Sequence, residues 1–210
     1  SRDAIIKNIR DAVSVPVIAV NVIKTPGEAE KMLEEGIADL ASLGRQLIAD
    51  PEWANKAKAE CKEDIVPCLS CNNCINQSSM QLPIRCAINP LAGREVDDNE
   101  LVSGSGNVIV IGAGPAGIEA ALTFAKKGYD VLLAEKAAEI GGSLQLANKA
   151  PGKFRMDNLV EYYKTQIEKN SKITLKLKYE ITEKTLEEFE KMNPKAIVLA
   201  VGGTPIIPPF

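Results

Sequence analysis

Histidine is absent from the 210 residues, so the chain has no imidazole that could donate or accept a proton near neutral pH. Tyrosine is the other aromatic side chain that could act as a proton donor. All four tyrosines lie within predicted helices or strands, and we assign them no catalytic role: Tyr129, Tyr162, Tyr163 and Tyr179. We therefore predict that this part of the protein contains no catalytic residue.

Long apolar runs are also missing, since no stretch approaches the roughly 20 residues that a membrane-spanning helix needs. The net charge of −3 gives no reason to expect a nucleic acid or a membrane surface as partner. The first residues, SRDAIIKNIR, resemble neither a signal peptide nor a transit peptide. With 45% hydrophobic and 25% charged residues the composition is that of a soluble protein, which we place in the cytoplasm.

Cysteine is concentrated in one place. Four of the five cysteines, Cys68, Cys71, Cys74 and Cys86, are separated by gaps of two, two and eleven residues. Such clustering exceeds what a disulfide framework needs, and it indicates a reducing compartment and a metal bound by soft thiolates. Three close cysteines with a distant fourth favour a 4Fe-4S cluster. A structural zinc site and unligated thiols are the alternatives. Cys61 stands apart, and we expect it to be a free thiol.

The first sixty residues alternate between apolar runs and helical patterns. We predict strands at 14–20 and 37–44 and helices at 26–36 and 48–60. This β-α-β-α order implies an α/β fold with parallel strands. Two parallel strands cannot bury both of their faces, so residues 1–60 are interpreted as the end of a larger domain. Residues 61–104 show little periodicity, and SGSG at 103–106 is interpreted as a linker.

From Asn107 the pattern becomes regular again. NVIVIGAGPAGIEAALTFAKKGYDVLLAEK predicts a strand, a glycine turn, a helix and a second strand. Further elements follow, namely a helix at about 155–169, a strand at 173–180, a charged helix at 183–192 and a strand at 196–203. Residues 105–210 are therefore expected to form a Rossmann-like domain.

The segment GAGPAG, residues 112–117, is a G-x-G-x-x-G motif between that first strand and its helix. Gly112 allows the tight turn, Gly114 lets the backbone approach a pyrophosphate, and Gly117 lets helix and strand pack closely. The N-terminus of the helix attracts the phosphates, and Glu135 at the end of the second strand can accept ribose hydroxyls. A tight turn without a ligand is the alternative.

An acid at position 135 argues against a phosphate on the ribose. Two further glycine segments, Gly141–Gly142 and AVGG at 200–203, place more bare backbone near the same ligand. The arrangement resembles the FAD-binding half of glutathione-reductase-like flavoproteins. The expected FAD site consists of Gly112, Gly114, Pro115, Ala116, Gly117, Glu135, Lys136, Gly141, Gly142 and Gly203.

Taken together, the barrel-like stretch VPVIAV…DPEW, the four cysteines with CAINP, and GAGPAG through AVGGTPIIPP resemble one family. It comprises iron–sulfur flavoenzymes related to 2,4-dienoyl-CoA reductase, 2-enoate reductase and trimethylamine dehydrogenase. The resemblance implies three parts. Residues 1–60 would end an Old Yellow Enzyme-type (β/α)8 barrel that carries FMN, 61–104 would hold the 4Fe-4S cluster, and 105–210 would be an incomplete FAD-binding domain.

The resemblance further implies that loops after the two barrel strands bind the FMN phosphate through Asn21, Val22, Gly44 and Arg45. This chain departs from the family at Asn21–Val22, where glycine is usual, and the missing glycine lessens close backbone approach at that loop. Arg45 has an alternative role as an ordinary surface residue in a salt bridge.

As activity, the resemblance implies that NAD(P)H reduces an activated C=C bond of an enoate, enone or dienoyl-CoA, with electrons passing from FAD to the cluster to FMN. An amine dehydrogenase of the trimethylamine dehydrogenase type is one alternative, and a non-catalytic electron-transfer or zinc-stapled module is another. The expected partners are a small-molecule substrate, the rest of the polypeptide with its N-terminal barrel and NAD-binding domain, and a second copy in a homo-oligomer. We expect the 210 residues alone to be inactive.

Overall fold

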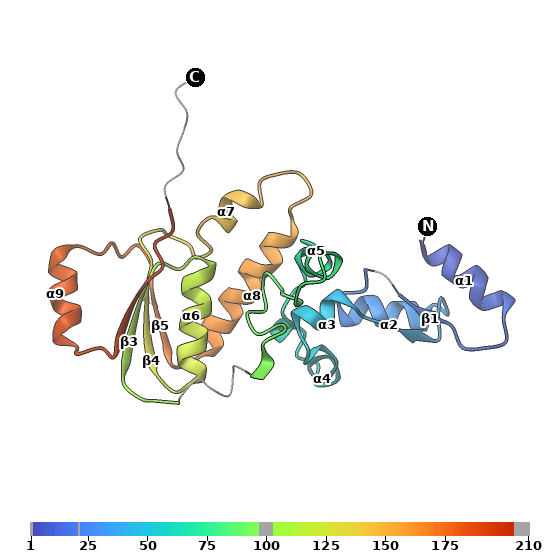
Figure 1. The fold of residues 1–210 in the computed structure, drawn as a ribbon, viewed down its shortest axis with the longest axis horizontal. Coiled ribbons are helices and arrows are strands. Elements are labelled where there is room, and N and C mark those ends of the chain that lie inside the picture. Colours follow the sequence, from blue (N-terminus) through green and yellow to red (C-terminus); the bar gives the residue numbers. More distant parts are fainter. Residues whose placement is uncertain (1, 21, 97–102, 204–210) are drawn as a thin grey trace, which may run out of the picture. The chain divides into compact units, whose positions relative to one another are not determined.

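The computed structural model describes residues 2–20, 22–96 and 103–203 (Figure 1). The chain divides into two compact units, residues 1–98 and residues 99–210. Each unit contains its own parallel sheet, which confirms the predicted α/β class.

The first unit begins with helix α1 (Arg2–Ala12) and continues through β1 (Ile18–Ala19), α2 (Pro26–Glu34) and β2 (Leu40–Ala41). The two strands pair in parallel, as predicted. They are much shorter than the predicted strands at 14–20 and 37–44, because each has one strand partner in the described part of the chain.

Helix α2 carries local signals at both ends. The Thr25 hydroxyl accepts a hydrogen bond from the Glu28 amide, and the Glu28 carboxylate accepts one from the Thr25 amide, which completes a capping box. Pro26 occupies the first turn, where its missing N–H costs nothing. After the helix, Gly36 takes a left-handed φ of 59°, a conformation that stops helices.

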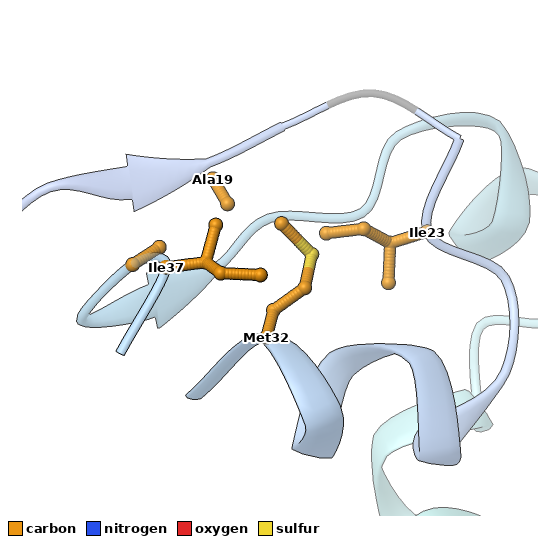
Figure 2. Packing of buried hydrophobic residues seen from close by; sticks show 5 residues of the cluster. Ala19, Ile23, Met32 and Ile37 are labelled. Carbon is orange, nitrogen blue, oxygen red and sulfur yellow. The ribbon is translucent and has the colours of Figure 1, made fainter. Parts of the chain in front are cut away.

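A small apolar core joins α2 to both strands. Ala19 of β1, Met32 of α2 and Ile37 before β2 are buried together with Ile23 and Ala38. Figure 2 shows the Met32 side chain extending from the helix into the space between Ala19, Ile23 and Ile37. Flexible methionine is suited to such an irregular gap between a helix and two short strands.

The single helix predicted at 48–60 is wrong. The structure contains α3 (Arg45–Ala49) and α4 (Trp53–Lys58), with Asp50 between them in an extended conformation. Pro51 explains the break, because proline disfavours helical backbone at the preceding residue and cannot donate a helical hydrogen bond.

Two short helical segments appear where the sequence showed little periodicity. A 3-10 helix, η1, covers Lys62–Asp64, and α5 covers Asn73–Ser79. Both lie in the first unit, in the segment that carries the four clustered cysteines.

The second unit has a four-stranded parallel sheet in the order β5-β4-β3-β6. The strands are β3 (Asn107–Ile111), β4 (Asp130–Ala134), β5 (Ile173–Lys176) and β6 (Ala196–Leu199). The helices are α6 (Pro115–Lys126), α7 (Leu144–Ala147), α8 (Arg155–Lys169) and α9 (Glu183–Lys191). Figure 1 shows α6 and α8 on one side of this sheet and α9 on the other, as in a doubly wound fold.

Most elements of this unit match the sequence-based expectation, and the strand ends are the exceptions. The strand predicted at 173–180 stops at Lys176, because Lys178 has a left-handed φ of 52° and the next amides donate to the β4 loop instead. The strand predicted at 196–203 stops at Leu199, before its glycines. In the described ranges, no helix combines the length and apolarity that a membrane crossing requires.

The core around α2 gives a first prediction. Met32→Ala should lower the free energy of unfolding of the first unit by about 2–5 kcal/mol, because it leaves a cavity at a side chain that is 4% exposed. The matched control is Leu33→Ala, which truncates the next residue on the same helix, where the side chain is 40% exposed. Urea unfolding of both variants measures the difference, and equal losses would show that this core does not hold the unit together.

Candidate functional site

The glycine loop of the second unit has a backbone that side chains would block. Gly112 has a φ of 103°, and a Cβ atom there would lie 2.4 Å from the Ala200 carbonyl oxygen. A Cβ atom on Gly117 would lie 1.9 Å from the Gly112 carbonyl oxygen. Both glycines therefore allow close packing of β3, α6 and β6. Gly114 has no atom within 4 Å of its Cβ position, which leaves open space beside its backbone.

Helix α6 begins directly after Gly114. Pro115 fills its first turn, and no side chain caps the N-terminus. The unpaired amides of a helix start, together with the helix dipole, favour an anion at this point.

Glu135 lies at the end of β4 and is 9% exposed. One carboxylate oxygen accepts a hydrogen bond of 2.7 Å from the Ala113 amide, and the other accepts one of 2.8 Å from the Ala137 amide. The carboxylate thus ties the glycine loop to the second strand. Each carboxylate oxygen can accept more than one hydrogen bond, so the same group has capacity for ribose hydroxyls.

The pair Gly141–Gly142 packs against the first glycine loop. Both have left-handed backbones, and the Gly141 amide donates to the Ala113 carbonyl at 2.7 Å. A Cβ atom on Gly142 would lie 3.1 Å from Gly114 Cα. Without side chains in the way, the two glycine segments can approach each other closely.

Helix α8 packs against the Gly141–Gly142 pair. A Cβ atom on Gly141 would lie 3.3 Å from a methyl group of Val160. The buried Tyr163 donates to Glu119 of α6 at 3.0 Å, which joins α8 to the helix of the glycine loop. Burial raises the pKa of Glu119, and the hydrogen bond from Tyr163 opposes that rise. No sequence pattern pointed to this pair, because its two residues are far apart along the chain.

These segments surround a cleft of about 720 Å³ at the carboxyl ends of the strands. Eight of the ten residues expected at an FAD site line it, namely Gly112, Gly114, Pro115, Ala116, Glu135, Lys136, Gly142 and Gly203. Gly117 and Gly141 do not line it, and their contacts show them to be packing positions. The lining also includes residues that sequence reasoning missed: Ala137, Ser143, Tyr179, Glu180 and Ile181. Residues Ala200–Gly202, from the AVGG segment expected near the ligand, line it as well.

Tyr179 was missed because it was assigned to a strand interior. In the structure it follows the end of β5, and its amide donates to the Glu135 carbonyl at 2.9 Å. The cleft is lined by glycine backbone, the N-terminus of α6 and the Glu135 carboxylate. Such a lining suits the pyrophosphate and ribose of a dinucleotide.

The first unit has a smaller pocket, of about 250 Å³, beside the ends of β1 and β2. Three of the four residues expected to bind the FMN phosphate line it: Val22, Gly44 and Arg45. The fourth, Asn21, lies outside the described residues. Val22 has a φ of 61°, a left-handed backbone that glycine adopts without strain. Glycine is therefore the residue that this turn geometry favours.

The pocket also contains polar residues that the sequence did not single out. Lys24 and Gln46 line it together with Arg45. Cys68 lines it too, from residues 66–89, which we call the cysteine segment. Its lining residues include two cations and no acid, so the pocket favours an anion.

Two buried polar side chains attach the start of the cysteine segment to the first unit. Gln46 donates to the Val66 carbonyl at 2.8 Å and accepts from the Cys68 amide at 3.0 Å. Asp50 accepts from the Val66 amide at 2.8 Å and pairs with Lys56 at 2.7 Å. Gln46 of α3 therefore holds Cys68, and Gln46 and Asp50 together hold Val66.

The four clustered cysteines are all unpaired thiols, with Cys74 buried, Cys71 exposed, and Cys68 and Cys86 half-buried. Burial raises the pKa of Cys86, the backbone amides of Ile88 and Asn89 oppose that rise, and the neighbouring Cys71 and Cys68 add to it. Amide donors beside a thiolate are typical surroundings of iron–sulfur ligands.

Over 2–20, 22–96 and 103–203, no three His, Cys, Asp or Glu side chains gather closely enough to hold one metal ion. A cluster is larger than a single ion and is held by thiolates at its corners, so it tolerates wider spacing. Cys61 is also a free thiol, whose sulfur contacts the Ala59 carbonyl at 3.4 Å.

Comparison with known proteins assigns both units. Residues 106–210 match the pyridine nucleotide-disulphide oxidoreductase family, and residues 1–64 match the NADH:flavin oxidoreductase / NADH oxidase family. An FMN-type barrel followed by an FAD/NAD-type domain defines a class of multidomain flavoprotein oxidoreductases. The chain belongs to this class, to the family of Old Yellow Enzyme-type flavoenzymes that includes NADH oxidase, enoate reductases and amine dehydrogenases.

Three relatives illustrate the match. The NADH oxidase of Thermoanaerobacter brockii is 38% identical over 206 residues, which is 96% of this chain and 31% of that protein. The N,N-dimethylglycine/sarcosine dehydrogenase of Chromohalobacter salexigens is 34% identical, over 95% of this chain and 29% of that protein. The structure of a 2-naphthoyl-CoA reductase superposes with a TM-score of 0.90 at 33% identity, covering 98% of this chain and 31% of that one. This chain thus spans about three tenths of their length.

The contrast between Gly114 and Gly117 gives a second prediction. Gly114→Ala should leave the apoprotein as stable as the parent but weaken FAD binding about tenfold, or about 1.4 kcal/mol, because its methyl group enters open cleft space. Gly117→Ala should instead destabilise the fold itself, by about 1–3 kcal/mol, because its methyl group meets backbone.

Thermal unfolding of the apoproteins and titration with FAD separate the two effects. Gly27→Ala in α2 is the matched control, since its Cβ position is equally open and lies in the other unit. An unchanged FAD affinity in Gly114→Ala would remove Gly114 from the ligand site.

Proposed function

We propose that this chain is part of an NAD(P)H-dependent reductase of an activated C=C bond, with FAD in the 720 Å³ cleft and FMN phosphate in the 250 Å³ pocket. The observation that carries the proposal is that Cys68 lines the FMN-phosphate pocket. A thiolate ligand and a flavin site thus share one wall. When bound, the flavins exchange electron pairs and a cluster exchanges single electrons, which suits transfer between two flavins.

The residues of the chain take separate roles in this proposal. The glycine loop and the start of α6 hold the FAD pyrophosphate, and Glu135 binds its ribose. Lys136, Gly142 and Gly203 complete the cleft lining. Arg45, with the backbone of Val22 and Gly44, holds the FMN phosphate. Asn21, which lies outside the described residues, is assigned to the same site.

We assign Cys68, Cys71, Cys74 and Cys86 as ligands of a 4Fe-4S cluster. The support is their spacing along the sequence and the backbone amide donors at Cys86. By function, we divide the chain into 1–60 for the barrel, 61–104 for the cluster and linker, and 105–210 for FAD. Such a cluster of reduced thiols also favours a cytoplasmic location.

The reductase assignment is supported by the close superposition on a 2-naphthoyl-CoA reductase. An amine dehydrogenase is the second candidate, favoured by 34% identity to the N,N-dimethylglycine/sarcosine dehydrogenase. The two candidate functions differ in the direction of electron flow. By family resemblance they also differ in the ligand of the dinucleotide cleft, because amine dehydrogenases of the trimethylamine dehydrogenase type can hold ADP there in place of FAD.

The protein purified without oxygen tests the proposal. We expect stoichiometric FAD, FMN and iron, bleaching of the flavin absorption by NADH or NADPH, and NAD(P)H oxidation that depends on an added enoate or enone. ADP in place of FAD, with flavin reduced by an amine and not by NAD(P)H, would replace the reductase by the amine dehydrogenase. A colourless protein containing zinc would contradict both.

The ligand assignment gives a third prediction. Cys71→Ser should lose bound iron and the cluster absorption while FAD still binds, because Cys71 lies in the other unit from the FAD cleft. Cys61→Ser is the matched control, since Cys61 stands outside the cluster motif, and it should keep full iron content. Iron analysis and absorption spectra of both variants measure the effect. Full iron content in Cys71→Ser would remove this cysteine from the ligand set.

A further inference from the structure

Two cations of the phosphate pocket also hold the cysteine segment. The Lys24 ammonium donates to the Cys68 carbonyl and to the Ser70 hydroxyl, both at 2.5 Å. The Arg45 guanidinium donates to the Asn72 side-chain carbonyl at 2.5 Å. Both cations line the pocket as well. The pocket and residues 68–72 therefore share the same two charged groups.

Two of the three contacted positions in this turn have strained backbones. Ser70 has a φ of 54° and Asn72 a φ of 61°, so both have left-handed backbones on either side of Cys71. Residues other than glycine adopt this conformation at a cost and keep it when surrounding contacts over-determine it. Lys24 supplies such a contact at Ser70, and Arg45 supplies one at Asn72.

The acceptors that these two cations contact on the turn carry no negative charge. Each acceptor on residues 68–72 is a neutral oxygen, from a carbonyl, a hydroxyl or an amide. The turn thus orients Lys24 and Arg45 without neutralising them. A side chain that is already ordered loses less conformational entropy when it binds an anion, so an ordered turn should strengthen anion binding.

We propose that phosphate binding in this pocket and metal assembly on the cysteine segment are thermodynamically coupled through Lys24 and Arg45. The coupling is favourable in both directions. An ordered turn around its metal presents the two cations to the phosphate, and a bound phosphate holds the cations where they support Ser70 and Asn72. Such coupling between sites must be reciprocal. The inference rests on the proposed function, because it assumes a flavin phosphate in the pocket and iron on the cysteines.

FMN and riboflavin are suitable probes, since they share the flavin ring and differ in the phosphate. The intact protein is freed of flavin, and half of the sample is also freed of iron with a chelator. We expect FMN to bind about tenfold more tightly to the iron-loaded form, within the range usual for coupled sites. Riboflavin should bind both forms equally. In the reverse direction, saturating FMN should slow iron loss to a chelator, and riboflavin should not.

Substitutions locate the coupling. Lys24→Met should reduce the tenfold FMN difference to near unity, and Lys24→Arg should restore part of it, because arginine keeps a charge and donors at the site. Lys31→Met is the matched control on α2, where the side chain is 71% exposed, and it should keep the full difference. The measurements on the unsubstituted protein test the inference even if Lys24→Met does not fold.

The outcomes distinguish this inference from the proposed function. Equal FMN affinity with and without iron would overturn the coupling while leaving the flavin and iron assignments intact. An equal change for riboflavin would also overturn it, by moving the effect from the phosphate to the ring. A protein that takes up neither FMN nor iron would overturn both the proposed function and the coupling.

Discussion

Parallel strand pairing governs where ligands can bind in both units. When neighbouring strands run in the same direction, the loops that follow them emerge at one edge of the sheet, and the helices that come next begin there. The cleft in the second unit lies at the ends of β3, β4 and β6, and the pocket in the first unit lies beside the ends of β1 and β2. Segments distant in sequence are thereby gathered around each space.

At these edges, glycines in the second unit allow close backbone packing, whereas buried polar side chains in the first unit form hydrogen bonds to an irregular segment. The second unit must bring backbone against backbone, so its loops carry glycine at the points where a Cβ atom would clash. The first unit must hold an irregular cysteine segment that lacks extended secondary structure. Gln46 and Asp50 satisfy backbone groups of Val66 and Cys68, which would otherwise lose their hydrogen bonds when buried.

The cysteine segment is part of the first unit by its contacts, although by composition it looks like a separate linker region. Trp53 of α4 donates to the Lys24 carbonyl, and Asn89, just after the last clustered cysteine, donates to the Ile48 carbonyl. These contacts join the pocket, the two short helices and both ends of the cysteine segment. The pocket of the first unit and the four clustered cysteines are thereby built from one continuous piece of structure.

The sequence by itself determined the features that depend on local chemistry: the α/β class, the glycine turn, the capped helix α2, and the clustering of thiolates. Periodicity, turn residues and spacing encode these directly. Prediction from the sequence failed where the outcome depends on contacts with other segments, as at β5, where the chain leaves the sheet and its amides donate to the β4 loop. The break at Pro51 was also missed. Only the tertiary structure decided that Lys24 and Gln46 meet Cys68 and that Tyr179 lines the cleft of the second unit, because such contacts join residues that no local pattern relates.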